Sequence, residues 1–220
     1  MSLKLYHCHE FRSVRSLWLM HELGLDFELQ IIPVGPALRN PDYLALHPLG
    51  RVPCLVDGDL TLFESGAICQ YLCETYDDGT LGRPVGHPER SEWLQWLHFA
   101  ETISVHGSTL THQNVFLRDD AQRSPYLQKL DTRRLEKCFE VLDTVLTDRD
   151  HMLASGFSAA DTMIGFSVYQ GAFFTTLGNH ANLEAYYQRI SSRPAFEAAM
   201  PAPDDPLRVY RQDRYGEYGR

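Results

Sequence analysis

The chain has 220 residues, of which 44% are hydrophobic and 22% are charged, a balance that supports one or two packed cores and excludes a disordered chain. Its 29 acidic residues outnumber the 20 basic ones and give a net charge of −9, which argues against an extended nucleic-acid surface. The sequence shows no signal-peptide pattern and no apolar run near the ~18 residues of a membrane span, so we expect a soluble cytoplasmic protein. Its five cysteines include no Cys-x-x-Cys pair, so we expect their thiols to be reduced.

The first 78 residues predict a small α/β domain. Residues 3–7 and about 27–32 read as strands, and the helical spacing between them lasts until Leu23-Gly24, where glycine ends the helix. A short helix begins at Asn40-Pro41, two strands flank the Asp57-Gly58 turn, and a further helix runs from Ser65 to about Tyr76. The order βαβαββα indicates a thioredoxin-like layer, whose sheet needs helices to cover it.

The rest of the chain predicts an all-helical domain. Residues 79–88 are rich in Gly and Pro and read as a linker. Amphipathic stretches follow within a domain that we place at residues 89–200. They cover about residues 89–116, 125–146, 158–175, 182–189 and 194–200. The tail, residues 201–220, carries three prolines and three tyrosines among charges; its sequence is compatible both with disorder and with folding back over a ligand cleft.

Two short motifs in the first domain describe a receptor for a small peptide. Pro53 has no amide proton, so it must open or edge the strand that follows. Val52 therefore keeps its backbone groups available for an added peptide strand, and a cis geometry is cheap at this X–Pro bond. Glu64 and Ser65 stand where a strand meets a helix. Free amides at a helix N-terminus bind carboxylates, and the glutamate can pair with an amine.

These motifs resemble those of the soluble glutathione transferases, whose first domain carries a Val-Pro followed at a similar distance by Glu-Ser. Ser158-Ala159-Ala160-Asp161 forms a capping-box pattern and resembles the start of the family's central helix. Arg193-Pro194-Ala195-Phe196 resembles the end of its late helix. The resemblance covers about residues 3–200 and is to bacterial-like members, with no class assigned. It implies a thioredoxin-like glutathione-binding domain followed by an all-helical domain.

The resemblance also implies which residues hold glutathione. The Val52 backbone, after which Pro53 is cis, would pair with the cysteinyl backbone of glutathione, and Glu64-Ser65 would hold its γ-glutamyl end. Arg51 would contact the glycyl end, assisted by Arg39. Because glutathione carries two carboxylates and the chain is acidic, locally placed cations are needed. Either arginine could instead be an ordinary surface residue.

The sequence departs from the family pattern at the position of the residue that activates the thiol. Aligned through Glu22-Leu23-Gly24-Leu25, Glu10 and Phe11 occupy the positions that most classes use for serine. Ser13 is the nearest hydroxyl and stands at the expected helix start, where it could equally be an N-cap. Arg12 can add positive potential beside it. Tyr6 lies near the place where the tyrosine-type classes carry their donor.

Cys8 would support a different chemistry. A cysteine at this site forms a mixed disulfide with glutathione in thiol transferases of the family, whereas a buried thiol at a strand end only packs. His7 and His9 flank Cys8, but no third ligand lies within range, so we predict no metal site.

The resemblance places the electrophile site on the first long helix of the second domain. Its wall would consist of His106, Thr109, Leu110 and Gln113, with Phe11 and Tyr169 opposite. We predict a detoxifying enzyme that conjugates the glutathione thiolate to a small hydrophobic electrophile and needs no metal. A Cys8-dependent thiol transferase or reductase, a non-catalytic glutathione-binding protein and a specialised lyase or isomerase are the alternatives.

The family's usual assembly is a two-fold homodimer. Apolar residues such as Leu62 and Phe63, just before the helix at Ser65, are compatible with an interface of this kind. We expect neither nucleic acid nor a membrane as a partner.

Overall fold

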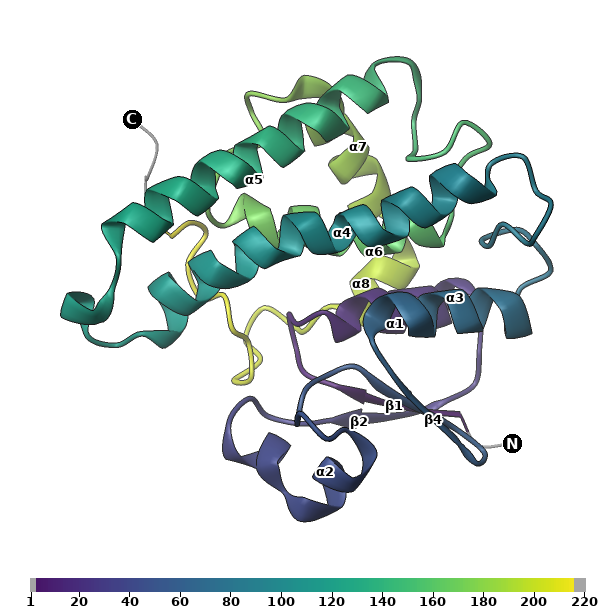
Figure 1. Cartoon of the computed structure of the whole chain (residues 1–220), viewed down its shortest axis with the longest axis horizontal. Helices are drawn as coiled ribbons and strands as arrows, with labels where there is room; N and C mark the ends of the chain where they lie inside the picture. The colour runs from purple at the N-terminus through teal and green to yellow at the C-terminus, as the bar shows by residue number, and fades with distance from the viewer. Residues whose placement is uncertain (1–2, 216–220) are drawn as a thin grey trace. The chain divides into compact units, whose positions relative to one another are not determined.

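A computed structural model describes residues 3–215, which divide into two compact units (Figure 1). The first unit combines the chain up to residue 85 with residues 193–209. The second combines residues 86–192 with residues 210–215. Among the described residues, none of the helices has the length and the apolar character that crossing a membrane requires.

The first unit is built on a four-stranded mixed sheet with the strand order β2-β1-β3-β4. The strands are β1 Leu3–His7, β2 Glu28–Ile31, β3 Cys54–Asp57 and β4 Leu60–Phe63. β1 runs parallel to β2 and antiparallel to β3, which in turn is antiparallel to β4. Gly58 turns the chain between β3 and β4 at a φ of 57°, in the left-handed region that glycine enters without a steric penalty.

Helices cover both faces of this sheet. They are α1 Ser13–Glu22, α2 Pro41–Leu46 and α3 Ser65–Tyr76. α1 and α3 lie together on one face and α2 lies on the other (Figure 1). The order of these seven elements confirms the predicted thioredoxin-like βαβαββα layer.

The last helix, α8 Pro194–Ala199, also packs in the first unit. The ring of Phe196 meets the edge of Trp18 with centroids 4.8 Å apart. Arg193 donates two hydrogen bonds to the Glu22 carboxylate, at 2.6 and 2.7 Å. The sequence grouped residues 194–200 with the helical domain, whereas the structure packs them against α1.

The second unit is helical. Its long helices are α4 Arg90–Thr111, α5 Pro125–Val145, α6 Ala159–Ala172 and α7 Ala181–Ser191. α4 passes into a π-helical turn, His112–Phe116, at its C-terminal end. α6 packs against α4 and α7 and is buried along nearly its whole length, so it forms the centre of this unit.

The predicted capping box starts α6. Ser158 accepts a hydrogen bond from the Ala160 amide, and Asp161 Oδ2 accepts one from the Ser158 amide at 2.8 Å. Asp161 Oδ1 accepts from the Met152 amide at 2.9 Å and from the Tyr186 hydroxyl at 3.0 Å. The carboxylate therefore joins the loop, the helix start and α7.

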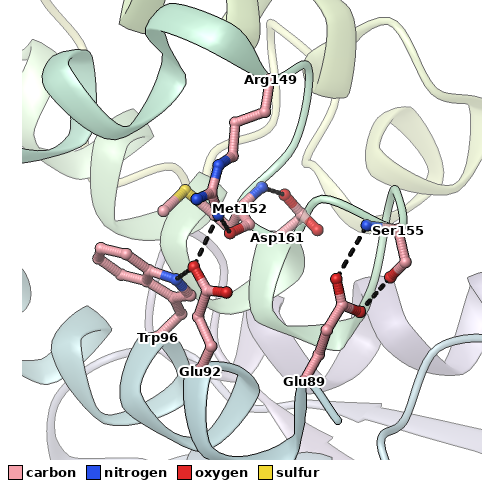
Figure 2. A network of polar contacts seen from close by, with 7 residues as sticks. All are labelled: Glu89, Glu92, Trp96, Arg149, Met152, Ser155 and Asp161. Atoms are coloured by element: carbon pink, nitrogen blue, oxygen red, sulfur yellow. Dashed lines mark hydrogen bonds and ion pairs between the residues drawn. The ribbon is translucent and has the colours of Figure 1, made fainter.

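A second group of contacts ties the same loop to the start of α4 (Figure 2). Arg149 Nη1 bridges Glu92 Oε1, at 2.6 Å, and the Met152 carbonyl oxygen, at 3.1 Å. Glu89 accepts hydrogen bonds from the amide and the hydroxyl of Ser155. These contacts hold the loop that delivers the chain into α6.

Candidate functional site

The Val52-Pro53 bond is cis, as the resemblance implies. β3 begins only at Cys54, so Val52 lies outside the hydrogen-bonded strands of the sheet. The Tyr43 hydroxyl, from α2, donates a hydrogen bond to the carbonyl oxygen of Arg51. Burial, the largest cause, raises the pKa of Tyr43, so its hydroxyl stays a donor at neutral pH. Tyr43 thus anchors the segment before Val52, a function that the sequence could not distinguish from an ordinary core aromatic.

Glu64 and Ser65 occupy the start of α3. Glu64 is exposed and has a φ of 79°, whereas Ser65 is buried as the first residue of the helix. The Ser65 hydroxyl oxygen accepts a hydrogen bond of 3.0 Å from Nη1 of Arg15, which is fully buried in α1. A buried guanidinium behind a helix N-terminus adds to the positive potential that attracts a carboxylate. Sequence reasoning missed Arg15 because a charged residue inside an amphipathic helix normally faces solvent.

The two candidate cations before Val52 are both exposed. Arg39 Nη1 donates a hydrogen bond of 2.7 Å to the Leu49 carbonyl oxygen, which attaches its guanidinium to the loop before Arg51. In that loop Gly50 has a φ of 56°, and a Cβ there would collide with the Leu38 carbonyl oxygen. Glycine is therefore required at position 50, between Leu49, which accepts the Arg39 hydrogen bond, and Arg51.

Ser13 is fully buried at the start of α1. Its hydroxyl donates to the Cys8 carbonyl oxygen at 3.1 Å and accepts from the Cys8 amide at 3.2 Å. The Ser13 hydroxyl therefore joins the two ends of the loop between β1 and α1. Arg12, partly exposed, occupies the N-cap position, where no side chain caps the helix.

Cys8 is also fully buried, in a core cluster with Ile32, Tyr43 and Cys54. Burial raises the pKa of its thiol to about 12. Because the thiolate is the nucleophilic form, this environment disfavours the Cys8-dependent thiol chemistry. Phe11 packs on the same cluster and stays partly exposed.

The flanking histidines form a pair. His7 Nε2 and His9 Nδ1 are 3.3 Å apart, and His7 is buried. Burial first, and the charge of His9 second, lower the pKa of His7 to about 3. Within residues 3–215 no group of three or more His, Cys, Asp or Glu side chains is arranged to hold a metal ion.

Glu10 makes a contact that no local pattern predicts. Its buried carboxylate accepts hydrogen bonds from Arg208 and from the Val209 amide. These partners lie 198 and 199 residues further along the chain. The segment after α8 is therefore bound to the same loop that contains Cys8 and leads to Ser13.

The other predicted electrophile residues lie in the second unit, on α4, its terminal turn and α6. His106 Nδ1 is 2.8 Å from Oδ1 of the buried Asp131, a partner that the sequence did not indicate. Leu110 is fully buried, and the hydroxyl of Thr109 donates within its own helix.

Two further predicted residues have neighbours that stabilise the helical unit. Gln113 is buried, and its side-chain oxygen accepts from the Ser124 amide at 2.7 Å, just before α5. Tyr169 is partly exposed and contacts the rings of Phe173 and Tyr210. Phe11 belongs to the first unit and the other five residues belong to the second.

Comparison with known proteins agrees with this architecture. A model of the glutathione S-transferase N-terminal domain matches residues 1–74, and one of the C-terminal domain matches residues 109–199. Glutathione S-transferase 3 of Zea mays is 30% identical and covers 88% of this chain and 91% of its own. Glutathione S-transferase GstA of Escherichia coli O157:H7 is also 30% identical, over 91% of this chain and 98% of its own.

Solved structures share the fold. BphK, a bacterial glutathione transferase solved as a ternary complex, has a TM-score of 0.79 at 26% identity, covering 90% of this chain and 97% of its own. A glutathione transferase homologue from Lodderomyces elongisporus, solved with two glutathione molecules per subunit, has a TM-score of 0.82 at 22% identity over the same shares.

Proposed function

The chain belongs to the glutathione S-transferase family and is a glutathione transferase, and on that premise we propose that it joins the thiolate of glutathione to a small hydrophobic electrophile. Glutathione is its co-substrate. The observation that carries the proposal is the combination, in the first unit, of Val52 outside the hydrogen-bonded strands with Glu64-Ser65 at the start of α3.

Glutathione binds in this proposal along the edge formed by these two motifs. The Val52 backbone pairs with the cysteinyl backbone, and Tyr43 anchors the preceding carbonyl. Ser65 and the amides of α3 receive the γ-glutamyl carboxylate, with Arg15 behind the hydroxyl. The exposed Glu64 carboxylate pairs with the γ-glutamyl amine.

The glycyl carboxylate is the second anion of glutathione. We assign it to Arg51, with Arg39 close to the same loop through its bond to Leu49. Both guanidinium groups are exposed, so each contact contributes modestly and weakens as salt is added.

The thiol is activated where α1 begins. The N-terminus of α1 and the Arg12 guanidinium supply positive potential that favours a thiolate. Ser13 is the proposed hydroxyl donor. To reach the sulfur, its hydroxyl must exchange the 3.1 Å bond to the Cys8 carbonyl oxygen, so a direct test of this residue decides its role.

The test is the ultraviolet thiolate absorbance of bound glutathione as a function of pH. In the unmodified protein we expect the bound thiol pKa to lie below that of free glutathione. Ser13→Ala should raise the bound pKa by about one to two units, each equal to about 1.4 kcal/mol. Cys8→Ala should leave it unchanged, because the Cys8 thiol is buried and protonated.

Three results would change the proposal. An unshifted thiol pKa with clear binding would indicate a non-catalytic glutathione-binding protein. Loss of turnover in Cys8→Ala alone would indicate the thiol transferase. A lowered pKa that survives Ser13→Ala would assign activation to the N-terminus of α1 and Arg12, with Ser13 holding the loop.

The electrophile site remains as proposed from the resemblance. In the second unit we assign its wall to His106, Thr109, Leu110, Gln113 and Tyr169, and the resemblance also implies Phe11 of the first unit. Support comes from the mixture of apolar side chains with a histidine whose ring is held by Asp131. We further propose that the enzyme acts in the cytoplasm, in detoxification, as a two-fold homodimer.

A further inference from the structure

Residues 201–209, here named the C-terminal strap, are bound to the loop between β1 and α1. Arg208 Nε and Nη2 donate to Glu10 Oε1 at 3.2 and 3.0 Å, and the Val209 amide donates to Glu10 Oε2. The Glu10 side chain is 0% exposed, whereas that of Arg208 is 27% exposed. The strap therefore provides the cation and the amide that compensate a buried carboxylate.

A second contact lies one residue away in the same loop. His9 Nε2 is 3.4 Å from Asp205 Oδ2. Asp205 in turn accepts from the Leu207 amide at 2.7 Å, and Arg208 Nη1 donates to the Pro203 carbonyl oxygen at 3.3 Å. The strap is thus folded on itself in a way that presents Asp205 and Arg208 to His9 and Glu10.

The backbone of the loop depends on these contacts. Glu10 has a φ of 60°, in the left-handed region that residues other than glycine occupy at an energetic cost unless the surroundings hold them there. The strap and the first residue of α1 both hold this loop. The strap binds Glu10 and His9, and the Ser13 hydroxyl binds both backbone groups of Cys8.

The resemblance also places Glu10 at one of the two positions where most classes of the family would carry serine. A carboxylate in that place would repel a thiolate if it were turned toward one. Here the carboxylate is turned to Arg208 and Val209 and is neutralised by the guanidinium. Release of the strap would remove the Arg208 guanidinium and the Val209 amide from this negative charge, which lies just before the start of α1.

We propose that the C-terminal strap positions the loop between β1 and α1 for activation of the glutathione thiol, with Glu10 and Arg208 as positioning residues. This inference rests on the proposed function, because the activated thiol belongs to that function. It makes closure of the strap and binding of glutathione energetically coupled, and such coupling is reciprocal.

The test is a double-mutant cycle with Glu10→Gln, Arg208→Gln and the double variant. The bound thiol pKa and the glutathione dissociation constant are measured for each, together with hydrogen exchange of residues 201–209 with and without glutathione. We expect either single change to raise the bound thiol pKa by about half a unit or more, and the double variant to add little, because both changes break one interaction. In the unmodified protein glutathione should slow exchange in the strap.

Matched controls separate this effect from a general change of charge. Asp204→Asn alters an exposed carboxylate of the same strap, and Arg211→Gln alters an exposed arginine just beyond it. Neither should move the thiol pKa. Arg208→Lys keeps the charge but loses the two-nitrogen fork, so it should lie between the unmodified protein and Arg208→Gln. It also keeps the test decisive if Glu10→Gln does not fold.

The outcomes distinguish this inference from the proposed function. Faster exchange in the strap with an unchanged thiol pKa and dissociation constant would overturn the inference, because the strap would then only stabilise the fold. Additive effects of the two single changes would overturn it as well. An unshifted thiol pKa in the unmodified protein would refute the proposed function and, with it, the role in activation. In that case, slower hydrogen exchange in the strap upon glutathione binding would show only that the strap contributes to the affinity for glutathione.

Discussion

At the residue scale, burial removes charge from two side chains next to the proposed thiol site. The pKa of the Cys8 thiol is raised to about 12 and that of His7 is lowered to about 3, so both groups are neutral at pH 7. Because His7 is neutral, it supplies none of the positive potential that a bound thiolate needs. In the proposed mechanism that potential comes from the N-terminus of α1 and from Arg12, so the proposal depends on the geometry of the loop before α1.

His7 gives a prediction about stability and pH. Its pKa is near 6.5 in the unfolded chain and about 3 in the folded one, so between these values only the unfolded state binds the proton. Stability is therefore complete above pH 6.5 and falls as the pH is lowered toward 3, by about 1.4 kcal/mol per unit. From pH 7 to pH 5 we expect His7 to account for a loss of about 2 kcal/mol, measured by urea unfolding at both values.

The matched variant is His7→Gln, which retains a side chain able to form hydrogen bonds but does not titrate. Its loss of stability between pH 7 and pH 5 should be smaller than that of the unmodified protein by the same ~2 kcal/mol. An equal loss in both proteins would mean that His7 is not the group responsible. His21 and His47, whose pKa values are also lowered by burial, are present in both and cancel from the comparison.

At the element scale, the start of α6 depends on one carboxylate. Asp161 accepts hydrogen bonds from the amides of Met152 and Ser158 and from the hydroxyl of Tyr186. Burial, the largest cause, raises its pKa, while these donors act in the opposite direction. Because α6 is the centre of the second unit, loss of this cap should affect the whole unit and not only one helix end.

Asp161→Asn tests this dependence. The amide keeps the volume of the side chain but replaces an accepting oxygen by an NH₂ group that faces existing donors. We expect the free energy of unfolding to fall by about 3 kcal/mol, measured by urea denaturation at pH 7. Asp148→Asn, at an exposed carboxylate in the turn after α5, should change it by less than about 0.5 kcal/mol. Equal effects of the two changes would contradict the assignment.

At the scale of the whole molecule, local signals predicted most of the elements and distant contacts escaped prediction. Three local signals could be recognised in the sequence because each acts within a few residues: the cap at Ser158, the proline after Asn40 and the glycine after Leu23. The packing of α8 on α1 joins Glu22 to Arg193, and the strap joins Glu10 to Arg208. No pattern in either partner indicates the other.

The residues of the candidate site divide in the same way, into those with a local sequence signal and those that depend on distant contacts. Val52-Pro53 and Glu64-Ser65 could be recognised because each is a short motif whose chemistry depends on its own backbone. Tyr43 and Arg15 were missed because their importance lies in what they touch, the carbonyl of Arg51 and the hydroxyl of Ser65. An aromatic residue in a short helix and an arginine in an amphipathic one have ordinary explanations until the fold brings their partners close.

The oligomeric state is also a property of the whole molecule. Of the two apolar residues that the sequence indicated, Phe63 is 38% exposed whereas Leu62 is half-buried; Leu60 is 39% exposed, and all three lie on the edge strand β4. Phe63 stacks on His47 with ring centroids 4.7 Å apart, so part of an apolar surface is already organised there. In a two-fold dimer the same patch is used by both copies, and burying it would supply a favourable apolar contribution. We therefore expect the protein to sediment at about twice the 25.2 kDa of one chain.

Phe63→Gln removes this apolar ring without adding charge beside Glu64, and should weaken the dimer by at least about tenfold, which is about 1.4 kcal/mol. Sedimentation equilibrium measures the effect, and Val85→Gln, at a valine that is 86% exposed, provides the control. The variant should still bind glutathione, because Val52, Glu64 and Ser65 all belong to one chain. A monomeric unmodified protein, or a dimer whose dissociation constant is indifferent to Phe63→Gln, would place assembly elsewhere or exclude it.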